Sequence, residues 1–198
     1  GLVGASIDDF RLTMGKSRYS AAFTPPVGAH PKNGADPDWS YVKALVDFEG
    51  SDWGFHVTGG MFAPDFILDS SGVDRNTAFS DGHGVKLGAS LSWDAKFPYF
   101  EGYDLGSDDF TIETFIYMTT LSSGAILGPI SSRNLYDCYG LYRGPSGAVQ
   151  FRWTPDGVVA NEITFTMGTL TSGSLQHFAV SRVGGTLYAH KNGVLTAT

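Results

Sequence analysis

The chain has 198 residues, which is enough to bury a substantial core without a disulfide or a metal. Its net charge of −7 and its scattered 13 basic residues argue against a nucleic-acid partner. Cys138 is the only cysteine, which excludes an intramolecular disulfide, and no segment has the roughly 20 apolar residues of a membrane-spanning helix. We therefore expect neither nucleic-acid binding nor membrane insertion.

The N-terminal part contains one predicted strand followed by a linker. Residues 7–13 alternate between apolar and polar side chains, which predicts a strand. Pro25, Pro26 and the polar stretch 31–37 then indicate a connection between two units, and residues 41–48 begin the next apolar run. The pattern predicts three parts, namely a strand segment at 1–27, a linker at 28–40 and a domain at 41–198.

The C-terminal half is typical of an all-β fold. In residues 110–118, alternate positions are apolar and only Thr114 interrupts the apolar face, so this run predicts a long strand. Asn192 and Gly193 stand between two further runs and predict a hairpin. No sustained helical period is present, so short strands predict a sandwich or barrel. Further strands are predicted at 125–127, 139–142, 149–153, 163–166, 178–181, 186–190 and 194–197.

Several segments resemble the concanavalin-A-like, laminin-G-like jelly rolls that are common in phage tail and other virion proteins. Residues 43–50 resemble the opening strand of that family, and residues 105–117 resemble its "GxxDFTIExW" strand, with Phe115 in place of tryptophan. Residues 173–182 resemble its "GxWHHVAVSR" strand, and residues 184–198 resemble the following hairpin. The resemblance implies a two-sheet antiparallel jelly-roll sandwich over 41–198 that lacks its last strands.

The order of the segments is unusual for this family. Residues 7–13 and the following Arg18, Tyr19 and 23–26 resemble the closing strand and exit, which normally come after the hairpin. The chain is then either a window of a tandem array, with the end of one repeat before most of the next, or residues 1–27 supply a strand to this sandwich or to a neighbouring copy. An open sheet edge needs such a partner strand.

Catalytic patterns are missing from the strands where the resemblance would place them. Related glucan hydrolases carry paired carboxylates on alternate strand positions, but here Glu113 has Thr111 and Phe115 as its same-face neighbours. The sequence has no G-x-S-x-G motif. We therefore predict that the chain is not an enzyme, and that His177 packs against or bonds a neighbouring strand.

Two kinds of binding site are predicted. Asp104, Asp108 and Asp109 are candidates for a structural calcium, with Asp65, Asp69 and Asp74 as a second group, although aspartates are also ordinary turn residues. Exposed aromatic and amide side chains would bind a glycan, although core packing is the alternative for the rings. The glycan candidates are Trp53, Tyr99, Tyr103, Tyr136, Trp153 and Asn161. Asp8 and Asp9 are predicted to be structural, accepting from Arg11, Arg18 or backbone groups.

The resemblance implies a non-catalytic structural or adhesion module on a virion, such as a tail fibre, tail tip or capsid-surface protein. Its implied partners are other copies of itself, other virion proteins or a cell-surface glycan. Two alternatives are open. One is a purely architectural assembly or cement protein with strand exchange between copies, and the other is a secreted bacterial lectin-like carbohydrate-binding module.

Overall fold

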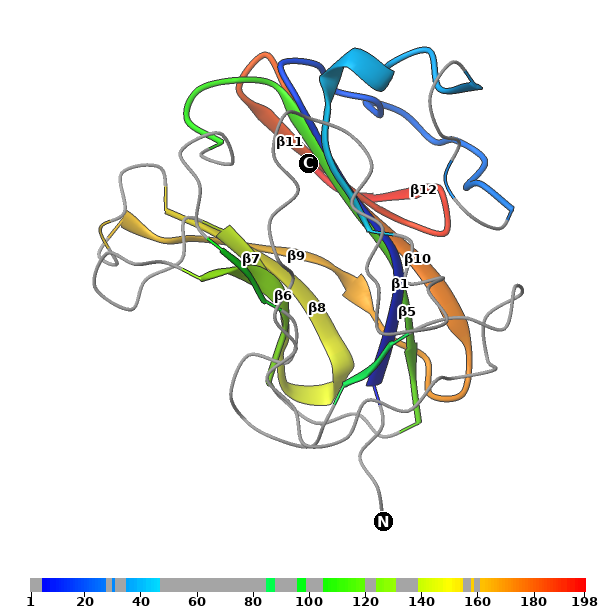
Figure 1. Ribbon diagram of the computed structural model, residues 1–198. Coiled ribbons are helices and arrows are strands. Elements are labelled where there is room, and N and C mark those ends of the chain that lie inside the picture. The colour runs from blue at the N-terminus through cyan, green and yellow to red at the C-terminus, as the bar shows by residue number, and fades with distance from the viewer. Residues whose placement is uncertain are drawn as a thin grey trace.

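The computed structural model describes residues 5–27, 30, 35–46, 85–87, 96–98, 105–119, 124–130, 139–154, 158 and 161–198. These residues form two β-sheets that pack on each other (Figure 1). The large sheet has the order β12 (Val194–Ala197), β11 (Thr186–Lys191), β10 (Leu175–Val183), β5 (Phe110–Met118), β1 (Ala5–Met14) and β2 (Val42–Val46), and β3 (Val85–Leu87) also pairs with β1. The small sheet has the order β4 (Lys96–Pro98), β6 (Gly124–Ile130), β7 (Tyr139–Arg143), β8 (Ala148–Trp153) and β9 (Ile163–Thr169).

The predicted all-β, two-sheet architecture is confirmed. Every described strand pair is antiparallel except β4 and β6, and the helical elements of the described residues are the short 3-10 turns Trp39–Tyr41 and Pro145–Gly147. The strand predicted at 110–118 has those bounds as β5. The other predicted strands of the C-terminal half lie within β6 to β12.

The predicted Asn-Gly hairpin is confirmed as a two-residue turn. Lys191 pairs with Val194, and both Asn192 (φ 51°) and Gly193 (φ 75°) have the left-handed backbone conformation of a type I′ turn. This turn type suits the natural twist of two antiparallel strands, and asparagine and glycine adopt it with the least strain. The sequence therefore determines the position of this hairpin within the large sheet.

β1 is an internal strand of the large sheet, between β5 and β2. A β-bulge between Asp8 and Arg11, with Asp9 at φ 47°, lets both Ile7 and Phe10 face the core. The Thr114 hydroxyl donates to the Asp8 carbonyl at 2.9 Å, so the residue that interrupts the apolar face of β5 satisfies a backbone group at the bulge. The bulge and its threonine partner are thus one structural unit.

The N-terminal strand therefore belongs to the sandwich of this same chain, which is one of the arrangements expected from the sequence. The tandem-array alternative and the division into 1–27, 28–40 and 41–198 stay predictions.

The core lies between the two sheets and is rich in aromatic rings. Phe10, Phe110 and Phe178 of the large sheet and Phe151 of the small sheet are almost completely buried, and the rings of Phe110 and Phe151 lie 5.8 Å apart. Burying one such side chain contributes about 1.5–3 kcal/mol. This interior explains why alternating strands with one apolar face fold into a two-layer structure.

The described residues between β1 and β2, namely 15–27, 30 and 35–41, lie across the outside of the sandwich, and we call them the covering segment. Figure 1 shows this segment, in blue to light blue, on the side of the large sheet opposite β6, β7, β8 and β9. The large sheet thus has a core face toward the small sheet and an outer face under the covering segment.

Candidate functional site

The outer face of the large sheet carries ionisable side chains that strand pairing places side by side. Arg11 of β1 lies opposite Glu113 of β5, and Glu113 in turn lies opposite Ala179 of β10. Ala179 pairs with His190 of β11. Two residues along the same strands, His177 of β10 pairs with Phe115 of β5. Side chains at paired positions share one face of a sheet, so these residues form one cluster.

The covering segment is held to the outer face by backbone hydrogen bonds. The Gly15 N–H donates to the Asp109 carbonyl at 2.8 Å, and the Arg18 N–H donates to the Thr111 hydroxyl oxygen at 2.8 Å. Farther along, the Phe23 N–H donates to the Gly193 carbonyl at 2.9 Å. The segment therefore crosses β5 and reaches the β11–β12 turn before it returns to β2.

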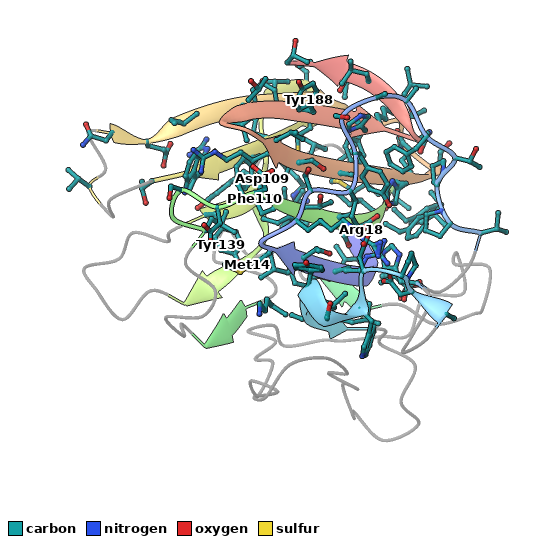
Figure 2. All side chains as sticks on the ribbon, turned by 90° about the horizontal axis from the view of Figure 1, so that it is seen from above. Met14, Arg18, Asp109, Phe110, Tyr139 and Tyr188 are labelled. Carbon is teal, nitrogen blue, oxygen red and sulfur yellow. The ribbon has the colours of Figure 1, made fainter. Side chains whose placement is uncertain are left out.

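Arg11 is the centre of a buried ion network. Its Nε donates to Glu113 Oε1 at 2.7 Å and its Nη1 donates to Asp36 Oδ2 at 3.1 Å. Arg18, which Figure 2 shows beside β1, binds both carboxylate oxygens of Asp36. Tyr19 donates its hydroxyl to Glu113 Oε2 at 3.1 Å. Arg18 also donates to Asp38 Oδ2 at 3.4 Å, and Lys16 pairs with Asp38, so three cations balance three carboxylates. Arg11, Asp36 and Glu113 are each at most 3% exposed.

The network shifts the pKa values of its members. Burial opposes the charged form of Glu113, but His30, His177 and Arg11 outweigh it and hold the pKa of Glu113 well below its usual range. Burial likewise opposes the charge on Asp36, and the bonds from Arg18 lower the pKa of this carboxyl. Burial and the Glu113 charge raise the pKa of Tyr19. Both carboxylates are therefore ionised at neutral pH.

Three buried histidines surround this network. His177 Nε2 lies 3.1 Å from Glu113 Oε2, which confirms the prediction that His177 bonds a neighbouring strand. His30 comes from the covering segment, and burial lowers its pKa to about 3, although Glu113 acts in the opposite direction. Burial also lowers the pKa of His190. His30 and His190 are therefore neutral at physiological pH.

Aromatic rings of the covering segment seal the histidines from solvent. Tyr19 and Phe23 are stacked with ring centroids 3.5 Å apart, and Phe23 contacts His190 and His177 edge-on at 5.2 and 5.7 Å. His30 packs beside Phe115 at 6.2 Å. The outer face is therefore a second packed interior with a polar centre, and not an open groove at these positions.

The chemistry open to this cluster follows from its bonds. Both carboxylates accept from guanidinium groups, so neither is free to act as a general base toward a bound water. In contrast, donor atoms of His30, Glu113 and His177 all lie within 4.8 Å of one another, an arrangement that fits a metal ion. Among the described residues this is the one group of three or more His, Cys, Asp or Glu side chains so arranged.

The residues predicted from the sequence lie elsewhere. Trp153 is buried, with its ring 6.1 Å from that of Phe110 and the guanidinium of Arg182 5.2 Å above it, while Asn161 is exposed. Asp108 is exposed, and Asp109 accepts from the Gly184 N–H at 2.8 Å. Arg182 links two of these residues, because the guanidinium that lies over Trp153 also donates to the Asp108 carbonyl at 3.4 Å. The other predicted residues, Trp53, Tyr99, Tyr103, Tyr136 and Asp104, and the second group Asp65, Asp69 and Asp74, lie outside the described residues.

Sequence reasoning missed two of the cluster members that the covering segment supplies. His30 and Asp36 fall in or next to the polar stretch interpreted as a linker. Asp8 and Asp9 were predicted to accept from Arg11, Arg18 or backbone groups. Asp8 Oδ1 accepts from the Asp9 backbone N–H at 2.9 Å, whereas Arg11 and Arg18 donate to Glu113 and Asp36. The one available signal was a pair of opposite charges, Arg11 and Glu113, in the middle of two alternating strands.

Within the described part of the chain, the helices are too short and too polar to cross a membrane. Comparison of the chain with protein-family models, with curated proteins and with solved structures finds no match in any of the three.

Proposed function

We propose that the chain is a non-catalytic structural module of a virion, with a concanavalin-A-like, laminin-G-like jelly-roll topology, that packs against other copies of itself or against other virion proteins. The family part of this proposal rests on the resemblance of residues 105–117 and 173–198. The functional part rests on the outer face of the large sheet.

The covered outer face is the observation that carries the proposal. The paired carboxylates of related hydrolases would project from this face of β5, yet here Glu113 is fully buried and bonded by Arg11, Tyr19 and His177. A hydrolase needs two carboxylates that reach the substrate and a water. An outer face filled by the chain's own segment instead supports a role in packing.

Two neighbouring sheet edges offer a surface for assembly. Among the described strands, β12 ends the large sheet and β9 ends the small sheet. Val194 and Leu195 of β12 are 62% and 38% exposed, and Ile163 of β9 is 40% exposed. The Thr196 hydroxyl donates to the Met167 carbonyl at 2.7 Å, so the two edges lie side by side. Exposed apolar residues on strand edges favour pairing with another chain.

Sedimentation velocity over a concentration series tests this proposal. We expect the folded chain to self-associate, and we expect the double variant Val194→Asp/Leu195→Asp to be monomeric because a charged edge opposes strand pairing. Thr186→Asp, an exposed strand residue at the opposite end of β11, is the matched control and should associate like the wild type.

A glycan array, run once with calcium and once with chelator, tests adhesion on the same sample. Specific glycan binding by the monomeric variant would favour the adhesion alternative. Release of sugar products from any bound glycan would contradict the non-catalytic part of the proposal. A monomeric wild type that binds no partner and no glycan would contradict the part that assigns a role in packing.

A further inference from the structure

We propose that His30, Glu113 and His177 form a binding site for one zinc ion beneath the covering segment. Their donor atoms lie within 4.8 Å of one another, and the three residues come from the covering segment, β5 and β10. This site is independent of the proposed function, since it would anchor the covering segment whatever the outside of the sandwich binds.

The spacing of the donor atoms is close to that of a loaded site. Zinc bonds of about 2.0–2.2 Å place tetrahedral ligand atoms about 3.4 Å apart. His177 Nε2 and Glu113 Oε2, at 3.1 Å, are already near this separation. Because the widest separation among the three donor atoms is at most 4.8 Å, zinc binding requires them to approach one another by up to about 1.4 Å.

Unpartnered nitrogen atoms at the site point to a missing ligand. His30 is 2% exposed; the Asp9 backbone lies close enough to its ring to raise the pKa, but neither ring nitrogen has a hydrogen-bond partner of good geometry. His177 is 1% exposed, and its Nδ1 is likewise without one. Buried polar atoms are rarely left unsatisfied in folded proteins, and a metal ion would use one lone pair of each imidazole.

The remaining contacts suit a metal site. Arg11 holds Glu113 through Oε1, while Oε2 accepts from the Tyr19 hydroxyl and lies 3.1 Å from His177 Nε2, so zinc would take the place of the His177 contact at Oε2. With zinc bound, the Nε2 lone pair of His177 would coordinate the ion and the ring N–H would stand at Nδ1. Because guanidinium and carboxylate charges in the network already balance, the ion favours an anionic fourth ligand such as chloride or hydroxide.

The donor set selects the class of metal. Two imidazole nitrogens and one carboxylate oxygen suit zinc and its neighbours among the transition metals, whereas calcium and magnesium prefer oxygen ligands only. We therefore expect cobalt(II) to bind at the same place and an excess of calcium or magnesium to leave zinc binding unchanged.

Isothermal titration of the metal-stripped full chain with zinc chloride tests the proposal. The expected stoichiometry is one ion per chain. His30→Gln and His177→Gln should each weaken binding by more than about 100-fold, since loss of even an outer partner of a ligand weakens a site by about 10- to 100-fold. His190→Gln, which removes a buried histidine outside the ligand set, should bind like the wild type.

Two measurements on the wild type keep the proposal testable if a variant fails to fold. Zinc at 100 times its dissociation constant should raise the unfolding midpoint by about 5–10 °C. In ¹⁵N-histidine spectra, zinc should shift the ring nitrogens of His30 and His177 and leave those of His190 in place. Absence of binding, full affinity in His30→Gln, or zinc-induced shifts confined to other histidines would overturn the site.

Discussion

Replacing Arg11 with methionine removes the central cation of the buried network. Arg11 is 2% exposed and donates to both Glu113 and Asp36. Asp36 keeps its bonds to Arg18, so the variant leaves one buried carboxylate, Glu113, with only the longer ion pair to Arg18, whose Nε lies 3.9 Å from Glu113 Oε1. Breaking a buried ion pair from one side destabilises a protein by about 3–5 kcal/mol. Because His177 and Tyr19 still bond Glu113, we expect about 3–4 kcal/mol.

Urea unfolding followed by tryptophan fluorescence, together with calorimetry, measures this loss. For a chain of this length, it corresponds to a fall in the unfolding midpoint of about 6–16 °C. The matched control is Arg152→Met, whose side chain is 37% exposed and lies 3.8 Å from Glu162, so its effect should be about 1 kcal/mol. Equal effects of the two substitutions would refute the claim that the outer face is a packed interior.

A second variant separates the ion pair from simple packing. In the double variant Arg11→Met/Glu113→Gln, the Glu113 carboxylate is replaced by a neutral amide, so no buried charge is left without the Arg11 guanidinium. We therefore expect the double variant to be more stable than the sum of the single effects predicts, by about 1–3 kcal/mol. Strict additivity would show that the two side chains act independently.

Two further outcomes are expected. Gly193→Ala should destabilise the chain by about 1–3 kcal/mol and speed amide exchange at Phe23. The reason is that Gly193 has a φ of 75° and an added Cβ would lie 1.9 Å from the Phe23 carbonyl oxygen. The control Gly185→Ala, with a φ of 89° and no atom within 4 Å of the added Cβ, should keep slow exchange at Phe23. In the presence of chelator, stability should fall as pH drops from about 6.5 toward 3, by up to about 1.4 kcal/mol per unit, because His30 takes up its proton only on unfolding. His30→Gln should flatten this slope in urea titrations, and an unchanged slope would contradict the burial of a neutral histidine.

Local sequence patterns were sufficient to predict most of the strands, although β3 and β4 were not predicted. β5 and the β11–β12 hairpin follow from alternation and from the Asn-Gly turn, because both depend on residues adjacent in the chain. The bulge in β1 was not predictable in the same way. Its Asp8 carbonyl is satisfied by Thr114, which is 106 residues away, and Thr114 by itself only interrupted an apolar pattern.

The candidate site depends on contacts that no local pattern contains. Asp36 and His30 lie in a segment whose prolines and polar residues are typical of a linker. These residues acquire a role only when the covering segment folds back over β5 and β10 and places them beside Arg11 and Glu113. A polar residue in a loop and a polar residue in a buried network have the same sequence signature, so only the tertiary structure distinguishes them.

The position of the covering segment is the central claim, and nuclear Overhauser effects from Phe23 test it most directly. The Phe23 ring lies 5.2 Å from the His190 ring and 5.7 Å from the His177 ring. We predict strong effects between Phe23 ring protons and the ring protons of both histidines, in a ¹³C-edited spectrum of the full chain. Their absence, with Phe23 shifts typical of an unstructured peptide, would show that the outer face is open and would contradict both the buried network and the zinc site.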